Sequence, residues 1–356
     1  MELSVVYRKT ALSTIIAAII IVAATVFYYS YVNPTQVLNS VAELEEGAIA
    51  VKPEVVESED SLKFVESSEP TEYIWIPMPE GVSASDVAIE NHYMDGQLWI
   101  AISSDDVDFY KDASISGNIE YIEGGQANLV EEQIILKINM AHVYEYNTIF
   151  EDGVLYIEKV APSMLYDQIV MIDPAGQVAE ELINIASLSS ASDSLSPVRI
   201  CTDIASKLKS QLETDGVRVY VTSLDEREIP DESRLNLLNE IRPDMYIRIE
   251  TSADEDSKVY GTETVYNGTY FIPGFGSVEL ADLLESNVTT SIGGRAAGLI
   301  EAGEDDMIIR NATVPAATVK VGYYTNTQEN ILLNRDDYRT KIAQGIRNAV
   351  LEAFSR

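Results

Sequence analysis

Histidine and cysteine are scarce in this chain of 356 residues, which has two histidines, His92 and His142, and one cysteine, Cys201. A single cysteine cannot form an internal disulfide, and no pair of closely spaced cysteines is present to build a structural zinc site. Two histidines also exclude a histidine-rich metal site. No histidine follows His142, so Ser-His-Asp and Cys-His catalytic arrangements are excluded from the rest of the chain.

Basic residues are also few, because 24 Lys and Arg stand against 58 Asp and Glu, which gives a formal net charge of −34. Proteins hold nucleic acid through clustered cations on the phosphates, so nucleic-acid binding is excluded as a function. An acidic surface of this kind is typical of a well-solvated exported protein.

The N-terminal region contains a long apolar run over residues 11–32, and no charged residue occurs between positions 10 and 42. About 20 apolar residues suffice for a helix to cross a bilayer, so the run predicts a transmembrane helix. Arg8 and Lys9 precede it and the next charges are acidic, which places residues 1–10 in the cytoplasm. The expected location is the cell membrane, with a single pass and the remaining chain outside the cytoplasm.

A cleaved signal peptide is the alternative for this segment. Its apolar core would be shorter, and small residues would surround the cleavage site. Phe27, Tyr28, Tyr29 and Tyr31 occupy that place instead, so the sequence favours an uncleaved anchor.

Two regions with different patterns follow the anchor. Residues 33–70 are acidic and contain three prolines, which predicts an extended spacer. Residues 71–165 contain alternating apolar runs with Asp-Gly turns at 95–96 and 152–153, a strong hairpin signal. We therefore expect a small all-β sandwich over residues 71–165.

Residues 166–356 alternate between strand-like and helix-like patterns. The expected strands are 168–172, 217–221, 245–249 and 318–321, and the expected helices are 199–213, 231–241, 278–287 and 336–354. This order predicts an α/β fold with a mostly parallel sheet flanked by helices on both faces. In such folds the working site lies at the carboxyl ends of the strands.

Five segments of this region carry a family resemblance. They are Ile-Val-Met-Ile-Asp-Pro at 169–174, the stretches 203–209 and 234–249, Ile-Arg-Asn-Ala-Thr-Val-Pro-Ala at 309–316, and Val-Gly-Tyr-Tyr-Thr-Asn at 321–326. In order and spacing they resemble zinc-dependent N-acetylmuramoyl-L-alanine amidases, which are peptidoglycan hydrolases. The resemblance implies an amidase-like domain over residues 166–356. Some members of this family place a β domain before the hydrolase domain.

The residues that the family uses for chemistry are absent at the matching positions. The resemblance places Gly176, a position near Pro197, and Glu250 where the family has its zinc ligands, and Lys320 where it has its catalytic glutamate. Catalytic zinc takes three protein ligands and leaves one position for water. We therefore expect no zinc, no other cofactor and no catalytic residue. The domain is expected to be a degenerate, inactive amidase.

A vestigial groove is expected around these positions, formed by Asp173, Arg248, Glu250, Arg310, Asn311 and Lys320. We expect Lys320 to supply the positive charge that zinc supplies in the family and to pair with Glu250. Arg248 lies two residues before Glu250 on the same strand face and could assist.

The leading hypothesis is a membrane-anchored extracytoplasmic wall protein that binds peptidoglycan or regulates a partner hydrolase, in growth, division or sporulation. A second hypothesis is an active N-acetylmuramoyl-L-alanine amidase with unconventional ligands such as Asp173 and Glu250; two carboxylates favour harder ions than zinc. A third is a structural assembly protein that binds through its β domain. The expected partners are peptidoglycan or a cell-wall protein, and the membrane through the N-terminal helix.

Overall fold

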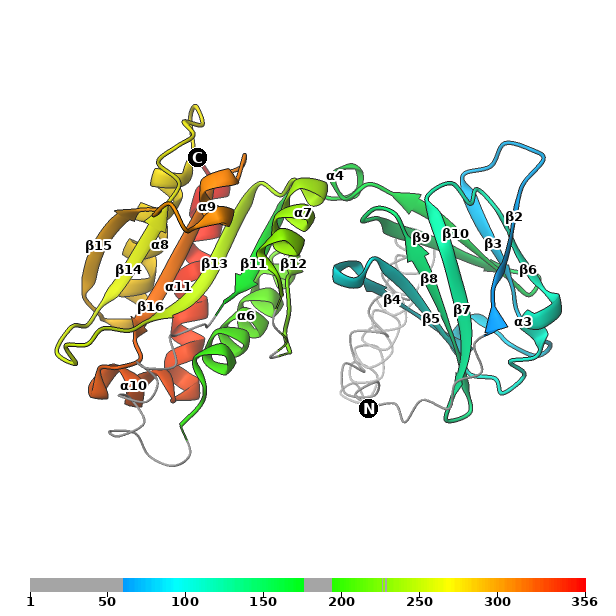
Figure 1. The fold of residues 1–356 in the computed structure, drawn as a ribbon, viewed down its shortest axis with the longest axis horizontal. Helices are drawn as coiled ribbons and strands as arrows, with labels where there is room; N and C mark the ends of the chain where they lie inside the picture. The colour runs from blue at the N-terminus through cyan, green and yellow to red at the C-terminus, as the bar shows by residue number, and fades with distance from the viewer. Residues whose placement is uncertain (1–59, 176–193, 226, 228) are drawn as a thin grey trace, which may run out of the picture. The chain divides into compact units, whose positions relative to one another are not determined.

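The computed structural model describes residues 60–175, 194–225, 227 and 229–356. The chain divides into two compact units, Met1–Val160 and Ala161–Arg356 (Figure 1). The predicted tail over 1–10 and transmembrane helix over 11–32 lie outside the described residues, as does most of the predicted spacer. Within the described ranges, no helix is long and apolar enough to cross a membrane.

The first unit is a β sandwich, as predicted. One sheet has the order β1-β7-β8-β5-β4 and is antiparallel throughout, and the other has the order β2-β6-β3-β10-β9. Ile74 and Ile76 from one sheet and Leu98, Ile100 and Leu136 from the other are buried in one shared core. The strands are β1 (Asp60–Ser61), β2 (Lys63–Glu66), β3 (Tyr73–Pro77), β4 (Val87–His92), β5 (Gln97–Ile102), β6 (Ser114–Gly117), β7 (Ile122–Val130), β8 (Gln133–Met140), β9 (Glu145–Glu151) and β10 (Val154–Val160).

Two limits of the predicted sandwich were wrong. Strands β1 and β2 fall inside the segment that was expected to be a spacer over 33–70. Leu62 is buried and Phe64 packs against the same core, so this acidic segment does contribute apolar surface. At the other end the first unit stops at Val160, because the short helix α4 (Pro162–Leu165) belongs to the second unit.

The predicted hairpins are present. Asp152 and Gly153 join β9 to β10 with φ angles of 50° and 72°, so both turn residues are left-handed. A two-residue turn of this type matches the twist of the strands that it connects. At the other Asp-Gly pair, Gly96 is also left-handed, with φ of 64°, and it precedes β5.

The second unit is an α/β domain, as predicted. Its six-stranded sheet has the order β12-β11-β13-β16-β14-β15, and only the pairing of β14 with β16 is antiparallel among the strands described. The strands are β11 (Ile169–Pro174), β12 (Arg218–Val221), β13 (Met245–Ser252), β14 (Thr262–Tyr266), β15 (Ala296–Glu301) and β16 (Ala316–Tyr323). The helices after α4 are α6 (Pro197–Thr214), α7 (Asp231–Ile241), α8 (Ser277–Ile292), α9 (Met307–Asn311), α10 (Thr327–Leu333) and α11 (Asp336–Phe354).

The two faces of this sheet differ in chemistry. Val170 and Ile172 of β11 and Val319 of β16 point into the main core, which also contains apolar residues of α6, α8 and α11. Successive side chains of a strand alternate between faces, so Asp173, Arg248 and Lys320 belong to the opposite face. Helices α7 and α9 cover that face in Figure 1. Helices therefore flank both faces of the sheet.

Candidate functional site

Strand register brings the polar residues of this face into two adjacent rows. In the first row Asp173 of β11 lies opposite Arg248 of β13. In the second row Glu250 of β13 lies opposite Lys320 of β16, and Lys320 lies opposite Glu263 of β14. Both rows are near the carboxyl ends of the parallel strands, where α/β folds place their sites.

Asp173 is a structural residue at the centre of the first row. Its side chain has no exposed surface, and its Oδ1 accepts hydrogen bonds from Thr222 Oγ1 at 2.6 Å and Arg234 Nε at 3.0 Å. Its Oδ2 accepts from the Tyr246 hydroxyl at 2.5 Å. Both carboxylate oxygens are therefore engaged. Asp173 is fully buried and does not line an open groove, so its place in the expected groove was wrong, whereas metal binding by Asp173 stays a prediction.

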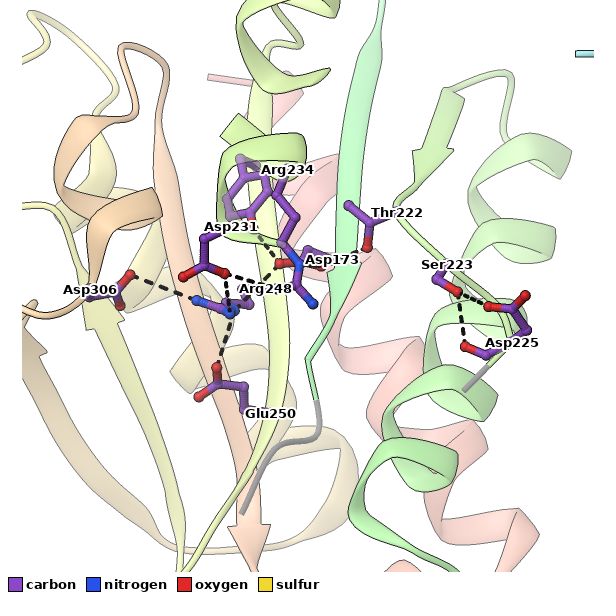
Figure 2. Close-up of polar contacts among 10 residues, drawn as sticks. Asp173, Thr222, Ser223, Asp225, Asp231, Arg234, Arg248, Glu250 and Asp306 are labelled. Atoms are coloured by element: carbon purple, nitrogen blue, oxygen red, sulfur yellow. Dashed lines mark hydrogen bonds and ion pairs between the residues drawn. The ribbon is translucent and has the colours of Figure 1, made fainter. Parts of the chain in front are cut away.

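Arg248 connects four structural elements through its guanidinium group, as Figure 2 shows. Its Nε lies 3.1 Å from Glu250 Oε1 and 3.4 Å from Asp173 Oδ2. Its terminal nitrogens lie 3.8 Å from Asp231, the first residue of α7, and 3.8 Å from Asp306, the N-cap of α9. This arginine, with a side chain only 14% exposed, anchors both covering helices to β11 and β13.

Glu250, at a position where the resemblance places a zinc ligand, is held between two cations. Burial raises the pKa of this carboxyl above its ordinary value, and the charges of Arg248 and Lys320 partly oppose that rise. The carboxylate is thus already neutralised by the protein itself. A metal ion at this position would compete with Arg248 for the carboxylate.

Lys320 pairs with a residue that the sequence analysis did not single out. Its Nζ lies 3.1 Å from Glu263 Oε1, and the Tyr323 hydroxyl donates to Glu263 Oε2 at 3.3 Å. The expected ion pair between Lys320 and Glu250 was therefore wrong, although the two residues are neighbours in the sheet. The reason is that β14, which was not predicted, brings Glu263 to the other side of Lys320.

The other two positions that the resemblance assigns to zinc ligands are Pro197 and Gly176. Pro197 is the first residue of α6, after the N-cap Ser196, and Gly176 lies outside the described residues. One turn further along α6, the Cys201 thiol is fully buried. Burial raises its pKa, and the charge of Glu250 adds to this rise. The beginning of α6 therefore lies near Glu250.

Arg310 and Asn311 do not join the cluster. Both are at the end of α9, and the exposed Asn311 side chain donates to the Met307 carbonyl of its own helix at 2.6 Å. The Arg310 backbone carbonyl accepts from Asn267. Helix α9 contributes to the site through Asp306 at its other end. The inclusion of these two residues in the expected groove was therefore wrong.

The described residues do not fit a zinc centre. Among them, no group of three His, Cys, Asp or Glu side chains is placed to hold a metal ion. Glu250 is paired with Arg248, and the position of the expected catalytic base holds the cation of Lys320. A divalent cation at this place would face two fixed positive charges.

Comparisons with known proteins identify the second unit. Residues 189–352 match the family model described as N-acetylmuramoyl-L-alanine amidase. The germination-specific N-acetylmuramoyl-L-alanine amidase of Bacillus subtilis (strain 168) is 24% identical over 172 residues, which cover 44% of this chain and 70% of that protein. N-acetylmuramoyl-L-alanine amidase LytC of the same organism is 23% identical over 152 residues, 43% of this chain but only 30% of that protein.

Among solved structures, the crystal structure of N-acetylmuramoyl-L-alanine amidase from Clostridium difficile 630 aligns with a TM-score of 0.46 and 23% identity. The alignment covers 53% of this chain and 97% of that one. Residues 189–352, which make up less than half of the chain, are therefore similar to the N-acetylmuramoyl-L-alanine amidase family.

Proposed function

We propose that this chain is a membrane-anchored wall protein whose amidase domain binds peptidoglycan without hydrolysing it. One observation carries the proposal: the carboxyl edge of the sheet holds the ion pairs Arg248–Glu250 and Lys320–Glu263 where the resemblance places a metal ligand and the general base. A protonated lysine cannot accept a proton from water, so Lys320 cannot act as a general base while it is charged.

The charge balance of the site supports this reading. In a zinc enzyme the metal supplies two positive charges and acidifies the attacking water. Here Arg248 and Lys320 supply two positive charges. Unlike a metal ion, a side-chain cation has no open coordination position in which a water molecule could bind. The scaffold is preserved while the chemistry that it would support is absent from the described residues.

The apolar run over residues 11–32 supports the proposed membrane anchor. An uncleaved helix there would hold both units outside the cytoplasm, beside the wall. Peptidoglycan recognition relies on backbone and loop contacts as well as metal contacts, so binding can persist without hydrolysis. Regulation of a partner hydrolase is the alternative form of the same proposal.

The similarity of residues 189–352 to the family also favours a second candidate, an active N-acetylmuramoyl-L-alanine amidase. Such an enzyme would need ligands beyond Asp173 and Glu250, since contacts within the protein engage both. A structural role carried by the β sandwich is the third candidate.

One experiment separates these functions. The purified full chain, kept in mild detergent, is tested for bound zinc by mass spectrometry, for release of stem peptides from muropeptides, and for co-sedimentation with isolated sacculi. We expect co-sedimentation without zinc or cleavage. Stoichiometric zinc together with amide cleavage would establish the active enzyme. If the chain neither cleaves nor sediments with sacculi, the peptidoglycan proposal is wrong and the structural role remains.

A further inference from the structure

A hollow lies at the end of β16 that leads into α10, outside the cluster around Arg248. It is lined by the loop between β13 and β14, the end of α8, helix α10 and the beginning of α11, and its volume is about 780 Å³. Helices α9 and α10 precede and follow β16, so this pocket and the Asp306 contact are at opposite ends of that strand (Figure 1). None of its lining residues belongs to the site already described.

The pocket is rich in cations. Four basic residues line it, on three separate parts of the domain: Lys258, Arg295, Arg335 and Lys341. Only two acidic residues line it, Glu329 and Asp337. This local excess of positive charge occurs in a chain with a formal net charge of −34.

Both acidic residues are already committed to other contacts. Asp337 holds Arg335 through two hydrogen bonds of 3.0 and 2.7 Å. Glu329 accepts from the backbone amides of Gly261 at 3.0 Å and Tyr323 at 2.7 Å. The local acids therefore neutralise only one of the four cations.

The other three cations have no carboxylate at ion-pair distance, although the charge of Lys341 does help to lower the pKa of Asp337. Lys258, Arg295 and Lys341 form no ion pair with any residue in the described ranges, and Arg295 lies over the Tyr260 ring at 5.0 Å. All three are exposed. Exposed unpaired cations add little to the stability of a fold, so packing does not account for their gathering around one hollow.

We propose that this pocket binds a linear anion with several phosphate groups. Lysine and arginine are the side chains that bind phosphate best, as point charges and as planar donor forks respectively. The hydroxyl and amide groups of Ser257, Thr327 and Gln328 add neutral donors at the rim. The volume of the pocket is in the range of sites that hold a whole small molecule, so it exceeds the volume of one phosphate group. The cations lie on separate elements, which suits a ligand whose negative charges are spread along a chain.

The phosphate assignment is favoured over an acidic peptide. A terminal phosphate carries about −1.5 to −2 charges and presents three acceptor oxygens, more than a carboxylate offers, whereas an internal phosphate carries one charge on two acceptor oxygens. The ends of a phosphate chain therefore match the cations of this hollow more closely than a carboxylate does, and the test below compares the two kinds of chain directly.

The test measures binding of a fluorescently labelled short linear polyphosphate to the purified full chain in mild detergent. Neutralising the three unpaired cations, in the triple variant Lys258→Gln, Arg295→Gln and Lys341→Gln, should raise Kd about ten-fold or more. A matched control removes the same charge from exposed positions elsewhere in the domain, in the variant Arg199→Gln, Arg242→Gln and Arg356→Gln. The control should change Kd by less than about two-fold, and binding should weaken as salt is added.

Three outcomes would overturn the proposal: no polyphosphate binding, equal losses in the two triple variants, or tighter binding of an oligoglutamate than of polyphosphate. A measurement on the wild-type chain keeps the test decisive if the pocket variant fails to fold. Polyphosphate should slow chemical acetylation of Lys258 and Lys341 and leave Lys209 unaffected, as read by mass spectrometry. Equal rates at all three lysines would contradict the proposal.

Discussion

Asp173 and Glu250 are carboxylates on the same sheet face, and their contacts give them opposite effects on stability. Asp173 receives hydrogen bonds on both oxygens from three side chains. Glu250 is also largely buried, but burial raises its pKa despite the neighbouring cations. Donors satisfy both oxygens of the first residue, whereas burial makes ionisation of the second residue costly.

Removing the charge of Asp173 should destabilise the second unit strongly. Asp173→Asn removes the fully buried carboxylate that pairs with both Arg234 and Arg248, and breaking a buried ion pair costs about 3–5 kcal/mol. The free energy of unfolding from urea titration followed by tyrosine fluorescence measures this loss. Glu232→Gln, at an exposed position of α7, serves as the control and should change stability by less than about 0.5 kcal/mol. Similar values for the two variants would contradict the structural role.

Glu250 should make the stability of the fold depend on pH. Its pKa in the folded state lies above the ordinary value of 4.5, so the folded state binds the proton more tightly than the unfolded state does. Stability therefore falls as the pH rises through the interval between these two values, and the loss is complete above the folded-state pKa. Glu250→Gln removes this dependence.

Relative to the wild type, Glu250→Gln should gain stability with rising pH, by about 1.4 kcal/mol for each unit by which the pKa is raised. Urea titrations from pH 4 to pH 8 measure the difference, again with Glu232→Gln as the control. A difference that does not change with pH would show that the Glu250 pKa is not raised.

At the scale of elements, the sequence was sufficient for the long regular segments. Strands β11 and β13 are apolar runs that a parallel sheet buries on both faces, and α6 and α11 show the spacing of amphipathic helices. Strand β15 was missed because its residues, Ala-Ala-Gly-Leu-Ile-Glu, are small and contain a glycine. Short elements give too few residues for a period to be recognised.

The missed elements explain the errors at the candidate site. Glu263 lies on β14 and Asp306 caps α9, and neither element was predicted. The ion-pair partner of Lys320 therefore could not be identified from the sequence, although the sheet neighbours Glu250 and Lys320 were placed correctly. Pairing across a sheet depends on strand order, and the antiparallel insertion of β14 beside β16 leaves no local signal in the sequence.

The N-terminus of α6 offers a test at this scale. The Ser196 hydroxyl accepts a hydrogen bond from the Arg199 amide at 3.2 Å, and Pro197 occupies the first helical position, which tolerates proline. Ser196→Ala should lower the free energy of unfolding by about 1 kcal/mol, because one amide of the first turn loses its acceptor. Ser196→Asp restores an acceptor and should recover the loss. Equal stability of the alanine variant and the wild type would show that this cap does not contribute.

At the scale of the whole molecule, the net charge of −34 acts against the compact state. Salt screens this repulsion, so we expect the unfolding temperature to rise when sodium chloride is increased from about 10 mM to about 500 mM. Over this range the screening length falls from about 30 Å to below 10 Å. Calorimetry measures the shift, and sucrose at matched osmolality separates screening from general solute effects. An unfolding temperature that falls with salt would show that attractive ion pairs outweigh the repulsion.

Restoring the family residues tests whether the scaffold still carries the geometry of a metal site. The four substitutions Gly176→His, Pro197→Glu, Glu250→His and Lys320→Glu replace the cation of Lys320 and supply three ligands and a base, drawn from four segments of the second unit. We expect stoichiometric zinc in the purified full chain, because the strand register and the beginning of α6 bring positions 197, 250 and 320 to one edge of the sheet. Arg248 keeps Asp173 as a partner after Glu250 is replaced.

Zinc content by mass spectrometry and release of stem peptides from muropeptides are the two measurements. The matched control carries only Gly176→His and Pro197→Glu, so it keeps the Arg248–Glu250 and Lys320–Glu263 ion pairs and should remain free of zinc. A folded quadruple variant without zinc would mean that the backbone of the site, and not only its side chains, has diverged from a metal-binding form. Zinc in the control would mean that Glu250 leaves Arg248 to bind metal, which contradicts the reading of this pair as a substitute for the ion.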